Sequence, residues 1–262
     1  HIFDSRFVPY ATQLVPLAVI RVVLGGEADH HSVKDRIRQW FWCGILGELY
    51  GSTTETRFAR DVEQVPDWAR TPGAPQPTTV TEAGFQETRL FTLKTRLSAA
   101  YKGIYALLIA GGAQDWIKGV TFGKAQYANL RADIHHIFPE KWSRDHGIPR
   151  QRYDSIINKT PLAAETNRSI GGAAPTAYLR KVEEKSGYPS ARLDEVIASH
   201  GIDPVALRSD DFDAHIDARK EFLIALIEEA MGKRVVRAPG EIDAVALSAE
   251  YEDDETEDES SL

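Results

Sequence analysis

The sequence predicts a mainly helical fold with a small β element. Apolar residues recur every three or four positions through most of the 262-residue chain, which is the spacing of helices that bury one face. Proline or serine at the start and glycine at the end bound several of these segments, as is typical of helices. One short apolar run, at 133–138, instead ends at Pro139 and has the length of a strand.

The N-terminal part of the chain is expected to consist of helices. The first helix should stop at the glycine pair 25–26, because glycine is common just after helix ends. Four prolines within 66–79 predict a linker or an ordered surface loop. The helices predicted from apolar spacing are residues 14–24, 33–50, 52–65 and 85–110.

The C-terminal part is expected to be helical as well. It follows a segment rich in glycine and aromatic residues, 111–129, that can hold short strands around 120–122. Helix start and stop signals then bound three segments, at 175–187, 190–201 and about 211–231. The last and longest is expected to stop at Gly232.

These patterns divide the chain into four parts. Residues 1–110 form a helical region, 111–185 hold the short strand, 186–247 carry the C-terminal helices, and 248–262 form an acidic tail. The ten residues 250–259 include eight acidic and no basic residues, which predicts disorder. Without those eight charges the formal net charge of −8 becomes zero, so the charge total does not exclude a nucleic-acid partner.

The single cysteine limits the redox chemistry of the chain. Cys43 alone excludes an internal disulfide and a cysteine-rich zinc site, and this usage fits the reducing cytosol. It lies in a predicted helix and is expected to be buried and inert. No signal peptide or membrane span is apparent, which predicts a cytoplasmic protein with no membrane partner. The first residue is His1 rather than Met, as expected for a fragment of a longer protein.

Two adjacent histidines close the predicted strand, and two asparagines follow downstream. His135 and His136 precede Pro139, and Asn158 and Asn167 lie nine positions apart. Phosphodiester hydrolysis needs an activated water, neutralisation of the phosphate charge, help for the leaving oxygen, and positioning. A neutral histidine is the usual base near pH 7, and a divalent cation supplies the second and third requirements. These residues therefore predict a metal-assisted hydrolase that cuts phosphodiesters.

The second asparagine is expected on a short helix that faces the strand. Thr160 is a suitable N-cap, Pro161 suits the first helical position, and Gly171 suits the position after the end. Asn167 then lies within this helix beside Arg168, a candidate phosphate contact. Because neighbouring strand residues point to opposite faces, the two histidines share a site only if the strand twists or breaks near its end.

Together these residues resemble the HNH, or ββα-metal, nuclease motif. The matching segments are Asp-Ile-His-His-Ile-Phe-Pro at 133–139, Asp-Ser-Ile-Ile-Asn-Lys at 154–159 and Thr-Asn-Arg at 166–168. Other segments are similar to the C-terminal half of GmrSD-like restriction proteins and SspE-type anti-phage proteins. These are Trp-Phe-Trp at 40–42, Gly-Glu-Leu-Tyr-Gly at 47–51, Ser-Ala-Ala-Tyr-Lys-Gly at 98–103, and the stretch from 170 to 179. The resemblance covers most of residues 35–185 and implies a helical domain that embeds an HNH nuclease motif.

The resemblance implies a role for each residue of the motif. His136 is the general base, Asn158 holds the loop and orients that base, and Asn167 is a metal ligand on the helix. His135 stands where many members of the family have an aspartate ligand. Lys159 and Arg168 are candidates for contact with DNA phosphates, ahead of Glu165 and His146.

The histidine at position 135, in place of the family's aspartate, affects which metal ion the site prefers. An imidazole and an amide without a carboxylate are less suited to Mg²⁺ and shift the preference towards Mn²⁺, Zn²⁺ or Ni²⁺. Mg²⁺ or Mn²⁺ is nevertheless expected in the cell, held partly through phosphate oxygens and waters.

Three functions are consistent with these residues. The leading hypothesis is a metal-dependent DNA endonuclease or nickase, the effector of a bacterial phage-restriction protein. In such proteins a nucleotide-hydrolysing sensor domain precedes the nuclease, and phage double-stranded DNA is the substrate. The alternative from another class is a DNA-binding module with a vestigial HNH site that relays a signal to the missing N-terminal domain. A ribonuclease shares the same chemistry.

Overall fold

The computed structural model describes residues 2–3, 5–51, 54–124 and 132–240. Over these ranges the protein is mainly helical with one two-stranded antiparallel sheet, which confirms the predicted class. Residues 241–262, which include the acidic tail expected at 248–262, lie outside the described residues. None of the helices in the described ranges is both long and apolar enough to span a membrane.

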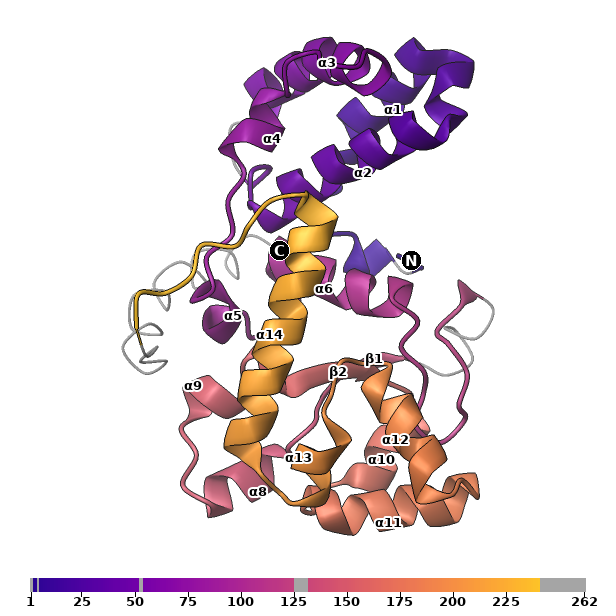
Figure 1. Ribbon diagram of the computed structural model, residues 1–262, viewed down its shortest axis with the longest axis vertical. Coiled ribbons are helices and arrows are strands. Elements are labelled where there is room, and N and C mark those ends of the chain that lie inside the picture. Colours follow the sequence, from indigo (N-terminus) through magenta and orange to yellow (C-terminus); the bar gives the residue numbers. More distant parts are fainter. Residues whose placement is uncertain (1, 4, 52–53, 125–131, 241–262) are drawn as a thin grey trace.

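Four helices form one end of the molecule (Figure 1). Their packing depends on large apolar side chains such as Trp40 and Val65, which are fully buried. One helix continues through Pro66, so the linker expected from 66 is wrong over its first residues. Burial of Val65, Pro66 and Trp68 supplies the apolar contact that offsets the backbone donor a proline lacks. The four helices are α1 (Leu14–Leu24), α2 (His31–Leu46), α3 (Thr54–Arg70) and α4 (Thr78–Glu82).

Two 3₁₀ turns accompany these helices. The first, η1 (Ser5–Phe7), precedes α1, and the second, η2 (Gly25–Asp29), follows it. Gly25 has a positive φ of 52° at the end of α1, in agreement with the stop expected at the glycine pair.

The segment expected to be helical over 85–110 is divided in two. The short α5 (Arg89–Thr92) and the longer α6 (Ala99–Ala110) are separated by a loop at 93–98. Ser98 is extended and its Oγ accepts a hydrogen bond from the backbone N–H of Tyr101. This side chain caps α6 and prevents one continuous helix.

The two strands are β1 (Asp133–His136) and β2 (Lys159–Leu162), which pair in antiparallel register. His135 lies opposite Thr160, and His136 lies opposite Lys159. Around 120–122, where short strands were expected, an isolated bridge joins Gln114 to Thr121.

Short helices connect the strands and follow them. Between the strands lie α8 (Glu140–Asp145), α9 (Arg150–Tyr153) and the 3₁₀ turn η3 (Ile156–Asn158). After β2 comes α10 (Ala164–Ile170), which ends at Gly171 as expected.

The predicted start of the asparagine-bearing helix is wrong. Thr160 and Pro161 belong to β2, and α10 begins after Ala163, which provides no side-chain cap. Pairing with β1 fixes both residues as strand, and the Thr160 hydroxyl hydrogen-bonds to His200 instead of capping a helix. Pro161 is tolerated because its strand lies at the edge of a two-stranded ribbon.

Three of the described C-terminal helices begin at or next to the expected residues, but the one expected at 190–201 ends at Ala198, and the short helix at 204–208 was not predicted. The C-terminal helices are α11 (Pro175–Ser186), α12 (Ser190–Ala198), α13 (Pro204–Arg208) and α14 (Phe212–Met231). Asp211 caps α14, and Gly187 and Gly232 adopt left-handed conformations after α11 and α14.

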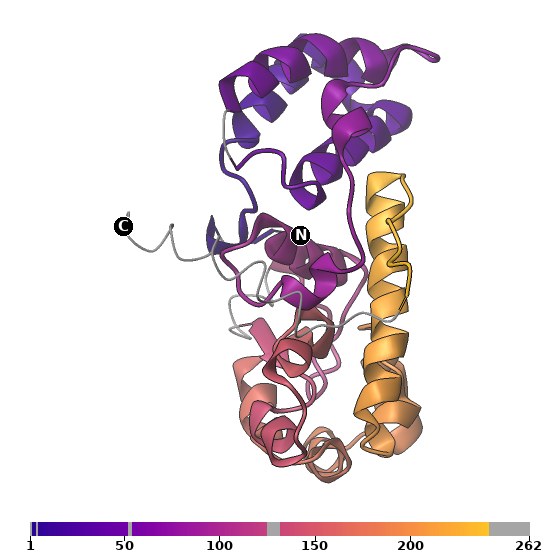
Figure 2. The same cartoon turned by 90° about the vertical axis from the view of Figure 1, so that its left-hand side faces the viewer.

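The longest helix joins the two ends of the protein. Figures 1 and 2 show α14 running alongside most of the molecule, and it packs against α2, α6 and η3. Near its C-terminus the carbonyl of Met231 accepts hydrogen bonds from the Gln39 amide, at 3.0 Å, and the Cys43 thiol. Burial raises the pKa of Cys43 to about 11, so this thiol is inert as expected.

Candidate active site

A histidine–carboxylate pair lies where the ribbon meets the connection between its strands. His136 is the last residue of β1, and its Nε2 lies 3.1 Å from Oδ1 of Asp154, which follows α9. Their side chains are 27% and 17% exposed, so solvent reaches the imidazole more readily than the carboxylate. Because a carboxylate accepts the hydrogen bond, Nε2 carries a proton, and Nδ1 is the basic nitrogen whenever the imidazole is neutral.

A lysine holds the carboxylate from the opposite strand. The Lys159 ammonium lies 2.7 Å from Asp154 Oδ1 and donates to the carbonyl of Lys94 at 2.6 Å. Burial alone would raise the pKa of Asp154, but hydrogen bonds from His136 and Lys159 outweigh it and hold that pKa well below its usual range. Asp154 is therefore ionised at neutral pH.

Lys159 itself is 7% exposed at the side chain, and burial lowers its pKa against the opposing effect of Asp154. Its ammonium is directed inward, towards Asp154 and the ring of Tyr101. This burial does not fit the DNA-phosphate contact expected for Lys159.

Asn158 fixes the loop that carries these groups. Its side chain is fully buried, and its Oδ1 accepts from the Phe138 N–H at 2.9 Å. Its amide donates to the carbonyls of Phe138 and Tyr153, at 2.9 and 2.8 Å. The amide thus ties the end of β1 to the residue before Asp154, which is the loop-holding geometry expected for Asn158.

The two histidines of the motif begin on opposite faces of the ribbon. They occupy consecutive rungs of the regular β1–β2 pairing, so the strand does not break between them. On the His135 face, Thr160 hydrogen-bonds to Nδ1 of His200 at 2.6 Å. Burial lowers the pKa of His200 to about 3, so this imidazole is neutral.

His135 retains a free donor atom. Burial lowers the pKa of its imidazole against the opposing effect of the Asp133 carboxylate, so the ring is neutral at pH 7. Its ring makes no hydrogen bond to any residue in the described ranges.

Asn167 and Arg168 lie on α10, which follows β2 after a single residue. Asn167 is half-buried, and its side-chain amide makes no hydrogen bond to another described residue. Arg168 is exposed in the last turn. The helix is anchored through Thr166, whose hydroxyl donates to the buried carboxylate of Asp115 at 2.8 Å.

The donor atoms present fit a divalent cation in part. His135 offers an uncharged imidazole nitrogen and Asn167 an amide oxygen, and both are uncommitted. In the part of the chain that the structure describes, no cluster of three or more His, Cys, Asp or Glu side chains is arranged to hold a metal. A cation held by either side chain would take the rest of its coordination from substrate and water.

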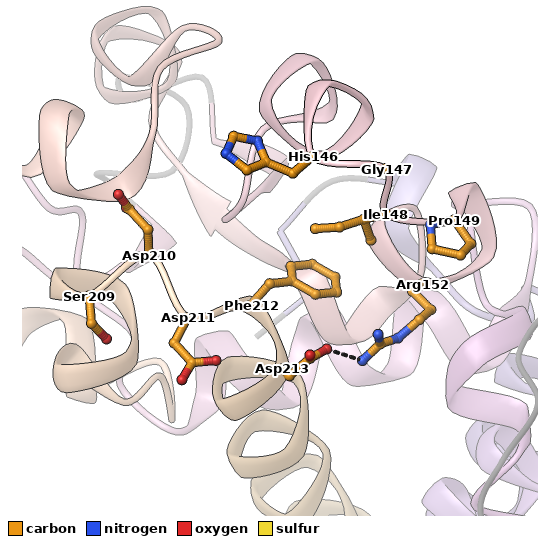
Figure 3. Close-up of a pocket in the computed structure, with 10 residues that line it drawn as sticks. All are labelled: His146, Gly147, Ile148, Pro149, Arg152, Ser209, Asp210, Asp211, Phe212 and Asp213. Atoms are coloured by element: carbon orange, nitrogen blue, oxygen red, sulfur yellow. Dashed lines mark ion pairs between the residues drawn. The ribbon is translucent and has the colours of Figure 1, made fainter.

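His146 lies in a different place, in an open pocket of about 530 Å³ (Figure 3). Its ring stacks on Trp142 and its Nδ1 donates to the Trp142 carbonyl at 2.8 Å. The pocket also contains Phe212 and an ion pair of 2.7 Å between Arg152 and Asp213. With three aspartates in its lining against one arginine, the pocket does not suit a phosphate group.

Glu165 is on α10 and pairs with Lys118 at 2.8 Å in a half-exposed ion pair. Its carboxylate is thus already paired with a cation, and its side chain is 50% exposed.

Asp154 is the residue of the candidate site that the sequence did not single out. It lies within the matched segment 154–159, and an acidic residue four positions before an asparagine has no distinguishing pattern. The only available signal is its place in the motif. Its contact with His136 depends on a chain reversal through α8 and α9 that the sequence does not specify.

Comparison with known proteins gives little further guidance. No family model matches the chain, and no solved structure matches it. The chain is 27% identical over 167 residues to a protein of Methanocaldococcus jannaschii named as uncharacterized protein MJ0686. The match covers 62% of this chain and 28% of that relative, so the chain spans under a third of its length.

Proposed function

We propose that this chain is a metal-dependent DNA endonuclease of the HNH type that hydrolyses one strand per event. The observation that supports the proposal most is the His136–Asp154 pair at the end of a two-stranded ribbon, directly followed by a helix that carries Asn167. An imidazole held by an ionised carboxylate is equipped to accept a proton. The combination agrees with the motif resemblance in residue order and in secondary structure.

In the proposed reaction His136 is the general base. Its Nε2–H donates to Asp154, so Nδ1 takes the proton from a water molecule as the water oxygen attacks phosphorus. The resulting imidazolium is stabilised by the adjacent carboxylate, which stays ionised. The bond from phosphorus to the leaving oxygen then breaks and this oxygen takes a proton from a solvent water, which leaves a phosphate monoester on one side of the nick and a hydroxyl on the other. The imidazolium returns its proton to solvent.

Asp154, Lys159 and Asn158 are positioning residues in this proposal. Lys159 keeps the carboxylate ionised and in place, and Asn158 fixes the backbone at Tyr153, just before the carboxylate, and at Phe138, just after β1. Lys159 is thereby reassigned from phosphate contact to support of the base. Arg168 remains the candidate for phosphate contact, since it is exposed on α10.

His135 and Asn167 are the residues that would hold the divalent cation. A bound Mg²⁺ or Mn²⁺ supplies Lewis-acid stabilisation of charge on the phosphate and leaving oxygens. Zn²⁺ or Ni²⁺ suits the imidazole equally and belongs in any metal series.

The biological setting follows from the resemblance. Phage double-stranded DNA is the proposed substrate, and a nucleotide-hydrolysing sensor domain of the same protein is the proposed partner in a bacterial restriction system. A cytoplasmic location is part of the same proposal.

The test is nicking of supercoiled plasmid across a series of Mg²⁺, Mn²⁺, Zn²⁺ and Ni²⁺, with His136→Ala beside the wild type. We expect wild type to convert supercoiled to open-circular DNA, and His136→Ala to remain folded while losing at least about 10²-fold in rate, the range of a lost general base. Asn167→Ala should act likewise and regain part of its rate at raised metal concentration. Wild-type rates in His136→Ala would remove the base assignment.

EDTA separates the nuclease from a DNA-binding module with a vestigial site. Chelation stops metal-dependent cleavage but leaves salt-dependent binding to DNA unchanged. Binding without cleavage under every metal would favour the module, and cleavage of RNA alone would favour a ribonuclease.

A further inference from the structure

A loop from the helical part of the protein supports the candidate site. Residues 93–98, here called the 93–98 loop, connect α5 to α6. The carbonyl of Leu93 accepts a hydrogen bond of 2.8 Å from the Ile156 N–H, and the carbonyl of Lys94 accepts one of 2.6 Å from the Lys159 ammonium. One carbonyl thus holds Ile156, two residues after Asp154, and the other holds Lys159, which pairs with Asp154.

A single carboxylate binds both ends of the segment 89–98, which contains α5 and this loop. Glu48 accepts a bidentate pair from Arg89, with distances of 2.9 Å to Nε and 3.0 Å to Nη2. Its Oε1 also accepts from the Ser98 hydroxyl at 3.1 Å. Since Arg89 begins α5 and Ser98 ends the loop, Glu48 closes the whole segment 89–98. Bidentate guanidinium–carboxylate pairs fix geometry as well as charge.

The backbone at Glu48 is unusual for its residue type. Its φ is 52°, in the left-handed region that side chains other than glycine rarely adopt. Backbone hydrogen bonds from Glu48 to Ile45 and from Leu49 to Gly44 hold this turn at the end of α2. A costly conformation that persists because surrounding contacts demand it is a reason to look for a role of the residue.

We infer that Glu48 is a positioning residue for the candidate site. By binding both ends of segment 89–98 it fixes the position of the backbone carbonyls in the 93–98 loop. The Lys94 carbonyl in turn holds Lys159, and Lys159 holds Asp154 beside the His136 imidazole. This gives a function to the Gly-Glu-Leu-Tyr-Gly segment at 47–51. The catalytic consequence rests on the proposed nuclease function, whereas the structural one does not.

The experiment compares Glu48→Gln with a matched control, Glu82→Gln. Glu82 pairs with Arg57 at 3.0 Å between α3 and α4, so its variant also breaks an ion pair in the helical region, but away from the 93–98 loop. Arg89→Lys is a second variant that keeps the charge and loses the bidentate geometry. It serves if Glu48→Gln folds poorly.

Two readouts are measured for each full-length variant. The first is hydrogen exchange of the Ile156 amide, which reports on the bond to Leu93 without requiring activity. We expect Glu48→Gln to exchange about tenfold faster than wild type at this amide, and Glu82→Gln to be unchanged. The second is plasmid nicking, where Glu48→Gln should lower kcat by about tenfold with KM unchanged, because the base is misplaced and not the substrate.

The outcomes separate the two proposals. Unchanged Ile156 exchange in both Glu48→Gln and Arg89→Lys overturns the positioning role, as does an equal change in Glu82→Gln. If the Ile156 amide exchanges faster in Glu48→Gln but kcat is unchanged, the loop does not position the His136 imidazole. If wild type cuts no nucleic acid, the nuclease proposal fails, and the exchange of Ile156 still decides the role of Glu48.

Discussion

Replacing Asp154 by asparagine tests the central pair of the site. Asparagine keeps the shape and can still present an oxygen to the Nε2–H of His136, but it removes the negative charge. The lost charge leaves the Lys159 ammonium, 7% exposed, without its ionic partner, and leaves the imidazolium formed in the reaction without stabilisation. The substitution should therefore lower both stability and rate.

The two magnitudes can be set from the burial of the pair. Removing one partner of a fully buried ion pair costs roughly 3–5 kcal/mol. Since Asp154 is 17% exposed, a loss of about 2–3 kcal/mol in the free energy of unfolding is expected, as for hydrogen bonds to charged groups. A poorly oriented base that cannot stabilise its proton should lower kcat by about 10²-fold, which corresponds to about 2.7 kcal/mol in the activation barrier.

Arg150→Gln is the matched control. The Arg150 Nε lies 3.4 Å from Oδ2 of the same carboxylate, but its side chain is 74% exposed. An exposed pair contributes under about 1 kcal/mol, so this variant should keep its stability and its nicking rate within about twofold.

Urea unfolding and plasmid nicking are measured on both variants and on wild type. If Asp154→Asn nicks as fast as wild type while folded, Asp154 does not orient the base. If Arg150→Gln loses as much activity as Asp154→Asn, the effect reflects general charge near the site and not the buried pair.

Two further predictions concern buried polar groups. Asn158→Ala removes three buried hydrogen bonds and should lower the free energy of unfolding by about 3–5 kcal/mol in urea titrations; a loss under about 1 kcal/mol would contradict its loop-holding role. Burial lowers the pKa of His215 to about 3, below the unfolded value near 6.5, so the folded state binds fewer protons and stability falls as pH drops through this window. His215→Leu should reduce that dependence by up to about 1.4 kcal/mol per pH unit between pH 6 and 4 in unfolding titrations, and an unchanged slope would show that His215 is protonated at no cost.

Helix boundaries were predictable wherever local signals determine them. Residues 14–24 match α1, and Pro175, Asp211 and Gly232 bound their helices as expected, since caps and glycine turns act on neighbouring residues. The errors at Pro66 and Thr160 have a tertiary origin. Packing carries α3 through its proline, and pairing with β1 makes a strand of residues that resemble a helix start.

For the candidate site, the sequence predicted which residues belong to it more accurately than it predicted the contacts of their side chains. The loop-holding geometry expected of Asn158 is present, while Lys159 faces inward and Asp154 was passed over. Residues 136, 154 and 159 meet only because two short helices reverse the chain between the strands. A contact across such a reversal leaves no periodic trace in the sequence. The metal roles of His135 and Asn167 stay predictions.

The position of α14 has a consequence for how the protein is made. This helix is the last of the described chain, and it packs on α2, α6 and η3, while the Arg219 guanidinium lies 3.5 Å from the Lys159 carbonyl at the start of β2. During translation, the residues around His136 emerge from the ribosome well before the helix that backs them. A nascent chain that has not yet reached residue 212 therefore lacks part of the core beneath its ribbon, so the ribbon should be fully packed only after α14 has been made.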